Sequence, residues 1–412
     1  MAAPQILIIG GGIAGPVLGL HLKLRGYEPI VYERLHHFVD LGVGLLLQPN
    51  GLKVLSFIPG LLESIDGGKV ESLISYSTLP EDEGLLGRND VPTTFSEKYG
   101  SPMMGVRRTT LHASLVAACE KHGVEVKWDH QCTAFEQHED SVTATFANGE
   151  TAAGSFLIGC DGLHSVIRIG LFGKETASYT GLTQAGGVCS TPASLRKPPA
   201  MTNFYGNGGH MITYPINDKE CSWALTLREE EHPETWHAAS SNILQKIKDS
   251  PQSTWAFGAG DLIKATDKVV KYGLYDRPQL TSWHKDRVVL LGDAAHPTSP
   301  HLGQGANQAF EDIYHLTAFL DELNLSREAL PTSELAKVFK AYENKRIERT
   351  SLLVKKAREQ GNSRVVSGVE KCKERDEVYR QSLTDGGHAQ SEVFAAMYAD
   401  SLGFKPIPSV PA

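Results

Sequence analysis

Three glycines near the start of the chain have the spacing of a phosphate-binding turn. Gly10, Gly12 and Gly15 lie between the apolar stretch QILIIG and a segment with helical periodicity. The first permits a tight turn, the second lets a pyrophosphate approach the backbone, and the third allows close packing of helix on strand. The spacing predicts dinucleotide binding, with a purely structural turn as the alternative. The residues assigned to this site are Gly10, Gly12, Ile13, Ala14 and Gly15.

An acidic residue closes the next apolar segment, PIVYER. In a dinucleotide site, Glu33 would accept hydrogen bonds from both hydroxyls of an adenosine ribose. Its negative charge would also repel a 2′-phosphate, which disfavours NADP at this position. Arg34 is a weaker addition to the same predicted site.

A late segment, GDAAHPTSPHLGQGANQAFED at residues 292–312, combines an acid with prolines and glycines. Asp293 follows an apolar strand at its carboxyl end, where it would bind the sugar-alcohol chain of a flavin. The prolines stiffen the loop, the glycines allow close approach, and the following helix would direct its positive N-terminus at a reduced flavin ring. The alternative for Asp293 is a helix cap. The residues assigned to the cofactor are Asp293, Pro297, Gly303, Gly305, Ala306 and Asn307, and Pro300 is assigned to the substrate.

Two further groups of polar residues have competing interpretations. Asp161 and Gly162 follow another apolar strand, in GCDGLHSVIR, and either contact the cofactor or cap a helix. His296 and His301 have types that bind metals, but no third ligand lies nearby in the sequence, so no metal site is expected.

The elements that must position these residues follow from periodicity. The β-α-β pattern of residues 5–34 implies a parallel sheet with a right-handed crossover. Residues 172–282 change to strands and polar loops, which predicts a second, mixed or antiparallel sheet. Other strands are expected at 124–128, 142–149, 156–162 and 287–293, and helices at 108–122, 304–320 and 333–360. The chain after Leu402 is proline-rich and predicted to be extended.

Composition excludes several classes of protein. The 412 residues carry a net charge of -8 without a basic block, which disfavours binding to nucleic acid. The six cysteines are scattered and predict reduced thiols. No secretion signal is evident, and no apolar run approaches the roughly 20 residues that a bilayer crossing requires. We therefore expect a cytoplasmic protein without stable membrane insertion.

The three motifs, in this order, resemble the class A FAD-dependent monooxygenases of the para-hydroxybenzoate and salicylate hydroxylase type. The resemblance spans roughly residues 5–320 and is carried by the Gly10 to Gly15 turn, by Asp161-Gly162 and by the GDAAHP stretch from Gly292. It implies that Arg108, in GVRRTTLHASL, binds the pyrophosphate or ribose side of FAD. It also implies that the backbone of Val43 and Gly44 faces the flavin ring.

The resemblance also implies a fold. We expect an α/β protein with a Rossmann-like FAD-binding domain, an inserted mixed-sheet substrate domain and C-terminal helices. The expected ranges are 1–75, 100–171 and 283–330 for the FAD-binding domain, 76–99 and 172–282 for the substrate domain, and 331–412 for the C-terminal helices and tail.

The activity implied by the resemblance needs two co-substrates. NADH or NADPH would bind transiently and reduce FAD, because only one dinucleotide motif is visible. Dioxygen would then react with reduced FAD to give a C4a-hydroperoxide, which hydroxylates or epoxidises an electron-rich aromatic small molecule. The sequence gives no oligomeric state.

The segment NFYGNGGHMITYPI is expected to line the substrate site. Tyr205, His210 and Met211 are predicted to contact the substrate from a strand face that also carries Tyr214. Tyr214 is the predicted catalytic residue, since a phenol could orient the substrate or assist proton transfer. Ordinary sheet packing is the alternative for each. Trp223 is predicted to lie in the core.

One stretch departs from the family pattern. Many relatives carry an aromatic-arginine pair in the strand that opens the substrate domain, whereas the matching stretch here is GLTQAGGVCS, with Gln184, Ala185 and Gly186. A missing arginine would favour a larger or less charged substrate.

Other functions remain open at this point. An alkene epoxidase or a reductase of the geranylgeranyl type would retain the flavin and change the reaction, and a flavin-binding sensor would not be an enzyme. The charged residues 355–377 are interpreted as a solvated helix face rather than a partner-binding surface.

Overall fold

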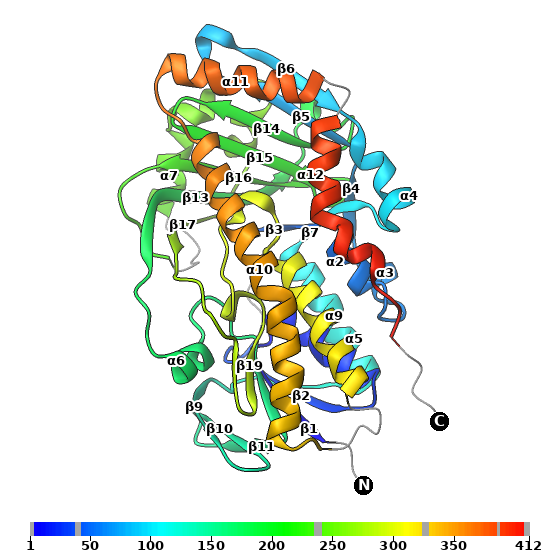
Figure 1. Cartoon of the computed structure of the whole chain (residues 1–412). Helices are drawn as coiled ribbons and strands as arrows, with labels where there is room; N and C mark the ends of the chain where they lie inside the picture. Colours follow the sequence, from blue (N-terminus) through cyan, green and yellow to red (C-terminus); the bar gives the residue numbers. More distant parts are fainter. Residues whose placement is uncertain (1–3, 38–42, 235–240, 324–328, 385–387, 408–412) are drawn as a thin grey trace.

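Two large sheets dominate the fold, and the long helix α10 (Thr332–Arg364) reaches from one to the other (Figure 1). The computed structural model describes residues 4–37, 43–234, 241–323, 329–384 and 388–407. In Figure 1 a six-stranded sheet lies in the lower half and a seven-stranded sheet in the upper half. No helix in these described ranges has both the length and the apolar character for crossing a membrane.

The six-stranded sheet is parallel except at one edge. In spatial order its strands are β18 (His284–Lys285), β19 (Val288–Leu290), β12 (Phe156–Gly159), β1 (Gln5–Ile9), β2 (Glu28–Tyr32) and β8 (Glu125–Lys127). Only the edge pair β18–β19 is antiparallel. The central strands are almost wholly apolar and buried, as parallel strands covered by helices require. This is the Rossmann-like arrangement that the β-α-β pattern predicts.

The seven-stranded sheet is mixed. In spatial order its strands are β17 (Val269–Asp276), β13 (Ser178–Ser190), β16 (Glu220–Arg228), β15 (Gly209–Pro215), β14 (Ala200–Gly206), β5 (Ser72–Ser77) and β6 (Gly84–Asn89). All neighbours are antiparallel except β14 and β5. Alternate side chains therefore face opposite sides of the sheet.

Two small antiparallel sheets complete the strands. The first is formed by β11 (Thr151–Gly154), β10 (Val142–Phe146) and β9 (Cys132–Gln137), and the second by β3 (Gly44–Leu47), β7 (Met103–Arg107) and β4 (Gly67–Val70). Asn148 and Gly149 lie in the connection between β10 and β11, and Gly149 has a φ of 88°, which glycine adopts readily.

The helices cover both large sheets. The remaining α-helices are α1 (Ala14–Lys23), α2 (Pro49–Leu55), α3 (Leu61–Ser64), α4 (Phe95–Tyr99), α5 (Arg108–His122), α6 (Val166–Phe172), α7 (Ser241–Lys248), α8 (Ala259–Lys264), α9 (Gly305–Leu323), α11 (Val369–Thr384) and α12 (His388–Tyr398). Helix α5 has the predicted bounds, because Gly123 adopts a φ of 72° and ends it. Helices α9 and α10 extend past their predicted ends.

The chain after α12 differs partly from the expected extended tail. Ala399–Gly403 forms a short 3-10 helix, and residues 404–407 have no regular structure. The Phe404 ring stacks on Tyr314 of α9, with 3.9 Å between ring centroids. Residues 408–412 of the predicted tail lie outside the described residues.

The boundary between the expected domains needs one adjustment. A boundary at residue 76 would divide β5, which begins at Ser72 and pairs with β14 of the seven-stranded sheet. We propose that the first segment of the substrate domain starts before Ser72. The other boundaries stay as proposed from the sequence.

Candidate active site

The glycine-rich turn after β1 has the backbone shape that a pyrophosphate site needs. Gly10 has a φ of 110°, and a Cβ there would lie 2.3 Å from the Cys160 carbonyl oxygen. A Cβ at Gly15 would lie 2.0 Å from the Gly10 oxygen, whereas nothing lies within 4 Å of one at Gly12. Space is therefore open where a phosphate must approach the backbone. Helix α1 begins at Ala14 after Ile13, which gives it no side-chain cap, so these residues fit the predicted pyrophosphate.

Glu33, which follows β2, stabilises this turn through a hydrogen bond. Glu33 is buried, and its Oε2 accepts a hydrogen bond from the Gly11 N–H at 2.7 Å. Its Oε1 accepts another from the Leu35 N–H at 3.0 Å. Each carboxylate oxygen can still accept a second bond, so a ribose contact stays a prediction. Arg34 is exposed.

The Asp161 side chain caps a helix. Its carboxylate accepts hydrogen bonds from the Ser165 hydroxyl at 2.6 Å and from the Val166 N–H at 2.7 Å, at the start of α6. Burial raises the pKa of Asp161, and these bonds oppose the rise. The capping alternative thus describes the observed geometry. Gly162, with a φ of 75° and open space at its Cβ position, leaves room for a ligand beside the turn, so cofactor contact stays a prediction.

Asp293 lies at the start of the late loop, residues 292–304, and is accessible to solvent. Its side chain is exposed, yet desolvation by the surrounding protein raises its pKa, and His296 and Arg108 oppose the shift. A carboxylate that is both accessible and closely surrounded by protein is suited to binding a polar ligand. A Cβ at Gly305, the first residue of α9, would lie 3.8 Å from Asp293 Oδ1. The acid and the start of the helix therefore meet as the sequence predicts.

The three predicted turns converge at one edge of the six-stranded sheet. They follow β1, β12 and β19, which are adjacent parallel strands, so their carboxyl ends lie together. The close approach of Gly10 to Cys160 joins the first turn to the second. Arg168, in the segment after the second turn, donates from Nη1 to the Ala295 carbonyl oxygen at 3.0 Å and so joins it to the third. Ligands of open α/β sheets bind at this edge.

Apart from the buried His301, residues 297–303 of the late loop are only partly buried. Pro297 has intermediate burial, and Pro300 begins a 3-10 helix that ends at Leu302. Gly303 has a φ of 62°, and a Cβ there would lie 3.1 Å from the Gln48 side-chain nitrogen. The contact of this loop with a flavin ring stays a prediction.

Two residues of α9 were also assigned to the cofactor. Ala306 is partly buried at the helix start. The Asn307 side chain is fully buried; its Oδ1 accepts from the Gln48 N–H at 2.9 Å, and its Nδ2 donates to the Leu46 carbonyl at 3.0 Å. The amide therefore holds β3 against α9, and any cofactor contact of Asn307 would come from its backbone.

The backbone groups assigned to the flavin ring have protein partners. The Gly44 N–H donates to Ser222 Oγ at 3.0 Å, and the Val43 carbonyl accepts from the Arg108 N–H at 3.1 Å. Desolvation lowers the pKa of Arg108, and the nearby charge of Asp293 opposes this shift. Arg108 and Asp293 thus share one electrostatic environment, and the contacts of all these residues with FAD stay predictions.

One face of the seven-stranded sheet carries a row of buried polar side chains. Cross-strand pairing places in this row Tyr272, Gln184, Thr226, His210, Tyr205 and Ser77. Tyr214 lies four residues after His210 on the same strand and so faces the same side. Burial raises the pKa of Tyr214 to about 12, although a Ser222 hydrogen bond lowers it. The phenol is therefore protonated near neutral pH and can donate a hydrogen bond.

The assignment of Met211 to the substrate is wrong. Strand alternation turns Met211 to the opposite face from His210. There it is fully buried in an apolar cluster with Phe204 and Trp223. The error arose because the sequence segment was treated as one surface, whereas a strand divides it between two. Trp223 lies in the core, as predicted.

The structure places Gln184 in the polar row, where an arginine was expected from the family pattern. The Tyr272 hydroxyl donates to Gln184 Oε1 at 2.6 Å, and Gln184 Nε2 donates to Thr226 Oγ1 at 3.2 Å. Ala185 faces the opposite, apolar side. This position of β13 thus supplies a neutral amide that is hydrogen-bonded within the sheet.

The interpretation of residues 355–377 as a solvated helix face is wrong for three residues. Arg364 is 8% exposed, Arg375 is 7% exposed and Asp376 is fully buried. The guanidinium of Arg375 lies 5.3 Å from the centre of the Tyr205 ring, and its Nη1 donates to the Gly206 carbonyl at 2.9 Å. The end of α10 and the first half of α11 therefore bring cationic groups to the polar row. A charge pattern alone does not reveal which helix face meets a polar surface.

The two histidines of the late loop have separate roles. His296 hydrogen-bonds through Nε2 to Asp312 Oδ2 at 2.6 Å. His301 is buried, and burial together with Arg364 lowers its pKa to about 3, so its ring is neutral. No group of His, Cys, Asp and Glu side chains within the described ranges could hold a metal ion.

A buried ionic network behind the late loop escaped the sequence analysis. Asp312 accepts from the Gly292 N–H at 3.0 Å and from Arg346 Nε at 2.7 Å. Arg346 Nη1 donates to Glu311 Oε2 at 2.6 Å, and all three charged side chains are fully buried. The network ties α10 and α9 to the start of the loop that carries Asp293. The adjacent acids of QAFED were visible in the sequence, but their arginine partner was not.

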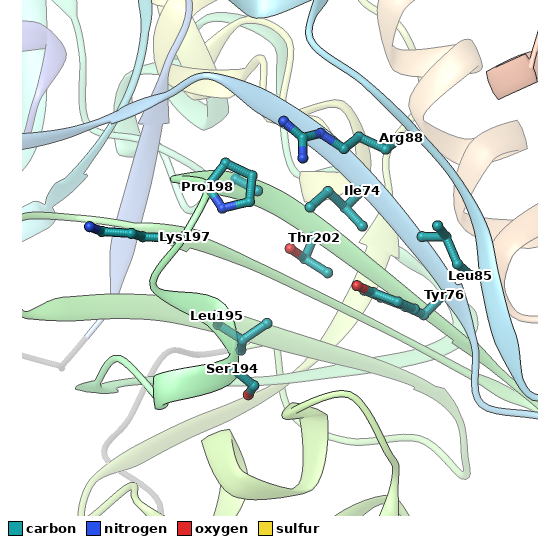
Figure 2. A pocket seen from close by; sticks show the side chains of 10 residues that line it. Ile74, Tyr76, Leu85, Arg88, Ser194, Leu195, Lys197, Pro198 and Thr202 are labelled. Carbon is teal, nitrogen blue, oxygen red and sulfur yellow. The ribbon is translucent and has the colours of Figure 1, made fainter.

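Two cavities among the described residues lie elsewhere. Figure 2 shows a cavity of about 210 Å³ beside the seven-stranded sheet, with Tyr76 and Thr202 from the face opposite the polar row and Arg88 and Lys197 at its rim. Another, of about 290 Å³, includes Thr183 and also lies on that opposite face. Neither contains a residue assigned to the cofactor or substrate.

The comparisons with known proteins agree with this geometry. The family model described as the FAD binding domain matches residues 4–356. The chain belongs to this FAD-binding family. It is 31% identical over 363 residues to the 3-amino-4-hydroxybenzoate 2-monooxygenase PtmB3 of Streptomyces platensis, covering 87% of this chain and 88% of that protein. It is 28% identical to the 6-hydroxynicotinate 3-monooxygenase of Bordetella bronchiseptica, covering 94% of this chain and 98% of that protein.

A solved structure supports the fold. Klebsiella pneumoniae HpxO, crystallised with FAD and uric acid, is similar with a TM-score of 0.81 and 23% sequence identity, covering 97% of each chain. The family and these relatives confirm the predicted class: the protein is an FAD-dependent monooxygenase. NADH or NADPH is the typical co-substrate of this family.

Proposed function

We propose that this monooxygenase uses NADH or NADPH and dioxygen to hydroxylate an electron-rich aromatic small molecule. One observation carries the proposal. The Gly10 turn, the Asp161 turn and the Asp293 loop follow neighbouring strands and meet at one sheet edge, where a single extended cofactor can contact all three. The named relatives act on hydroxylated aromatic or pyridine carboxylates, which supports the aromatic substrate class.

The reaction balances with these reactants. NAD(P)H supplies two electrons, one oxygen atom enters the substrate as a hydroxyl group, and the other leaves as water after taking up protons. Bound FAD would supply the redox chemistry that amino-acid side chains lack. The protein must hold the cofactor, orient the substrate and exclude water.

Several residues would hold the cofactor. The Gly10 to Gly15 turn would bind the pyrophosphate, and Glu33 would bind the adenosine ribose. Asp293 would bind the sugar-alcohol chain of FAD. The N-terminus of α9 beside Asp293 would stabilise negative charge that develops on the flavin.

The polar row would position the substrate. Tyr214 remains protonated, so we propose that it orients the substrate by donating a hydrogen bond, and we do not assign it the role of a base. His210 is buried; burial lowers its pKa well below the usual value, with a further contribution from Arg364, so the ring is neutral. Both side chains face the same side of the sheet as Gln184 and Tyr205.

The activity can be tested on purified protein. A yellow flavin spectrum should be present, and phenols, indoles and prenylated aromatics should be screened for stimulated NADPH and NADH oxidation. A substrate should cause oxygen uptake and form a product that is heavier by one oxygen atom. An epoxide product would identify the epoxidase alternative, and saturation of an alkene without oxygen uptake would identify the reductase. Flavin that no NAD(P)H reduces with any compound would favour a sensor.

The cofactor site has its own test. Replacing Asp293 by Ala should strip FAD from the purified protein, since the polyol loses its carboxylate partner; we expect affinity to fall by about tenfold or more. Flavin absorbance per protein measures the occupancy. Full occupancy in Asp293→Ala would contradict the assignment of Asp293.

We also propose that the enzyme works in the cytoplasm. All six cysteines are free in the structure, which suits a reducing compartment. Nicotinamide cofactors are available there. Fractionation of source cells, followed by immunodetection, would test this location.

A further inference from the structure

Arg364, the last residue of α10, carries a buried charge without a counter-ion. Its side chain is almost fully buried, and Nη1 donates to the His301 carbonyl at 2.8 Å. Its Nε is buried without any hydrogen-bond partner. In the part of the chain that the structure describes, no carboxylate forms an ion pair with Arg364.

Two neighbours of Arg364 also have buried nitrogen atoms without hydrogen-bond partners. These are Arg375 Nη2, which is a donor, and His301 Nε2, which donates in one of the two tautomers of the neutral ring. Arg375 Nη1 donates to the Arg364 carbonyl at 3.1 Å. The His301 ring lies against Gly361, one turn before Arg364, where an added Cβ would come within 2.4 Å of it. These contacts join His301, Arg364 and Arg375 into one group, the arginine cluster.

Together with Asp376, the arginine cluster carries a net charge of +1. Arg375 donates from Nε to Asp376 at 2.8 Å, so its charge is balanced. The nearby Arg358 pairs with Asp276 at 3.1 Å. His301 is neutral. Arg364 alone remains uncompensated.

Such an arrangement costs free energy in an empty protein. An unpaired buried charge costs several kcal/mol, and each unsatisfied buried donor costs about 1–3 kcal/mol. A buried water molecule could satisfy donors, but it would not neutralise the charge. A singly charged anion would do both.

The arginine cluster borders the proposed substrate site. Arg375 covers the Tyr205 ring, and Tyr205 lies 4.9 Å from the His210 ring between centroids. His301 directly follows Pro300 in the loop that carries Asp293. The cluster therefore lies between the polar row of the sheet and the late loop, beside both the predicted substrate and the predicted flavin.

We propose that Arg364, with the unpartnered Arg375 Nη2 and with His301 in the tautomer that is protonated at Nε2, binds the carboxylate of a monoanionic aromatic substrate. This inference rests on the proposed function and specifies its substrate class. The C-terminal helices would supply the cation that β13 lacks at Gln184. The substrate would therefore be anionic, contrary to the less charged substrate that the missing strand arginine suggested.

Binding of benzoate and benzamide to the purified FAD-loaded enzyme tests the proposal. The two probes have almost the same shape, but only benzoate is charged at neutral pH. Isothermal titration calorimetry should show that wild type binds benzoate about tenfold or more tightly than benzamide, as expected for a charge-assisted hydrogen bond. Arg364→Gln should remove this preference by weakening benzoate and leaving benzamide within about twofold.

Two further variants control the experiment. Arg380→Gln removes the same charge from α11, where Arg380 pairs with Glu377 and Asp82 away from the arginine cluster, and it should keep the benzoate preference. Arg364→Lys keeps the charge but loses the planar set of donors, so an intermediate preference is expected. If Arg364→Gln does not fold, Arg364→Lys and the preference of wild type still decide the question.

The outcomes separate this inference from the proposed function. A wild-type enzyme without benzoate preference, or a preference that survives in Arg364→Gln, would overturn the carboxylate site. Oxygenation of a neutral phenol would leave the monooxygenase proposal standing in that case. Conversely, selective benzoate binding that depends on Arg364, in a protein that oxygenates none of the screened compounds, would support the anion site and count against the proposed reaction.

Discussion

Two arginines on the same helix, Arg346 and Arg364 of α10, are buried in opposite electrostatic surroundings. Arg346 donates to both Glu311 and Asp312, which lie on α9 behind the late loop. Arg364 reaches the polar row of the seven-stranded sheet and has no acidic partner among the described residues. The charge of Arg346 is thus balanced by acidic partners, whereas the charge of Arg364 is not.

The pKa values of Arg346 and of its acidic partner Asp312 show that the two charges stabilise each other. Burial alone would lower the pKa of Arg346, but Asp312 and Glu311 raise it. Burial alone would raise the pKa of Asp312, but His296 and Arg346 lower it. A paired charge of this kind holds elements together. A buried charge without a partner can be neutralised by a charged ligand. The difference in pairing between Arg346 and Arg364 therefore separates a structural role from a binding role.

The largest effect is expected from Arg346→Met. It would leave Glu311 and Asp312 as buried charges with fewer partners, which should cost about 3–5 kcal/mol in the free energy of unfolding. Urea unfolding at saturating FAD would measure the loss, and flavin occupancy should fall because Gly292 loses part of its support. Arg380→Met, at an exposed ion pair, should cost about 1 kcal/mol or less. Equal losses of unfolding free energy in Arg346→Met and Arg380→Met would contradict a special structural role for the buried ion pairs of Arg346.

A medium effect is expected from Glu343→Gln on the same helix. Glu343 accepts hydrogen bonds from the Trp283 N–H and from His284 Nδ1, both at 2.8 Å. Burial opposes the shift, but His284 and Lys340 lower its pKa from 4.5 to about 2. The ionised carboxylate is therefore favoured by the fold, and the substitution should cost roughly 2 kcal/mol near neutral pH.

The pH dependence of Glu343→Gln has a definite sign. A lowered folded-state pKa contributes stability that is complete above the unfolded value of 4.5 and is lost as pH falls toward 2. The difference in unfolding free energy between wild type and variant should shrink across this window. A difference that stays constant from pH 6 to about pH 2.5 would show that ionisation of Glu343 does not contribute.

The smallest effect on stability is expected from Arg364→Met. Removing an uncompensated buried charge relieves a cost in the absence of substrate, but the lost hydrogen bond and packing of the guanidinium offset most of this gain, so the net change in the unfolding free energy should be about 1 kcal/mol or less. The lost bond to the His301 carbonyl acts in the other direction. Thermal unfolding of the FAD-loaded protein, side by side with Arg346→Met, would sharpen the comparison. A loss of about 3 kcal/mol would indicate that Arg364 is structural.

The turns assigned to the cofactor could be located from local sequence motifs. The positions of Gly10, Gly12 and Gly15 could be predicted because their roles depend on backbone shape within a single turn. The apolar strand before each motif could also be predicted, but the strand order that brings this turn close to Asp293 came from the structure. Asp161 was less certain, since a helix cap and a ligand contact require the same residue at the same place.

The substrate half was predicted less well. Tyr214 and His210 face the polar row, but Met211 does not, because register divides neighbouring residues between two faces. Arg364 was assigned to solvent, because nothing in its own helix indicates which surface it meets. Its contacts come from the late loop, which is distant in sequence, and from Arg375 of the next helix, which itself lies over the Tyr205 ring.

The sequence by itself determined the fold class and the cofactor turns, because these depend on short-range backbone constraints and on residues that follow apolar strands. The kind of reaction followed from the resemblance of the three motifs to a known family. Only the tertiary structure decided which charges are paired and which side chains share a face. Burial and electrostatic pairing are set by neighbours brought together from distant segments, and the sequence of one segment does not contain its partners.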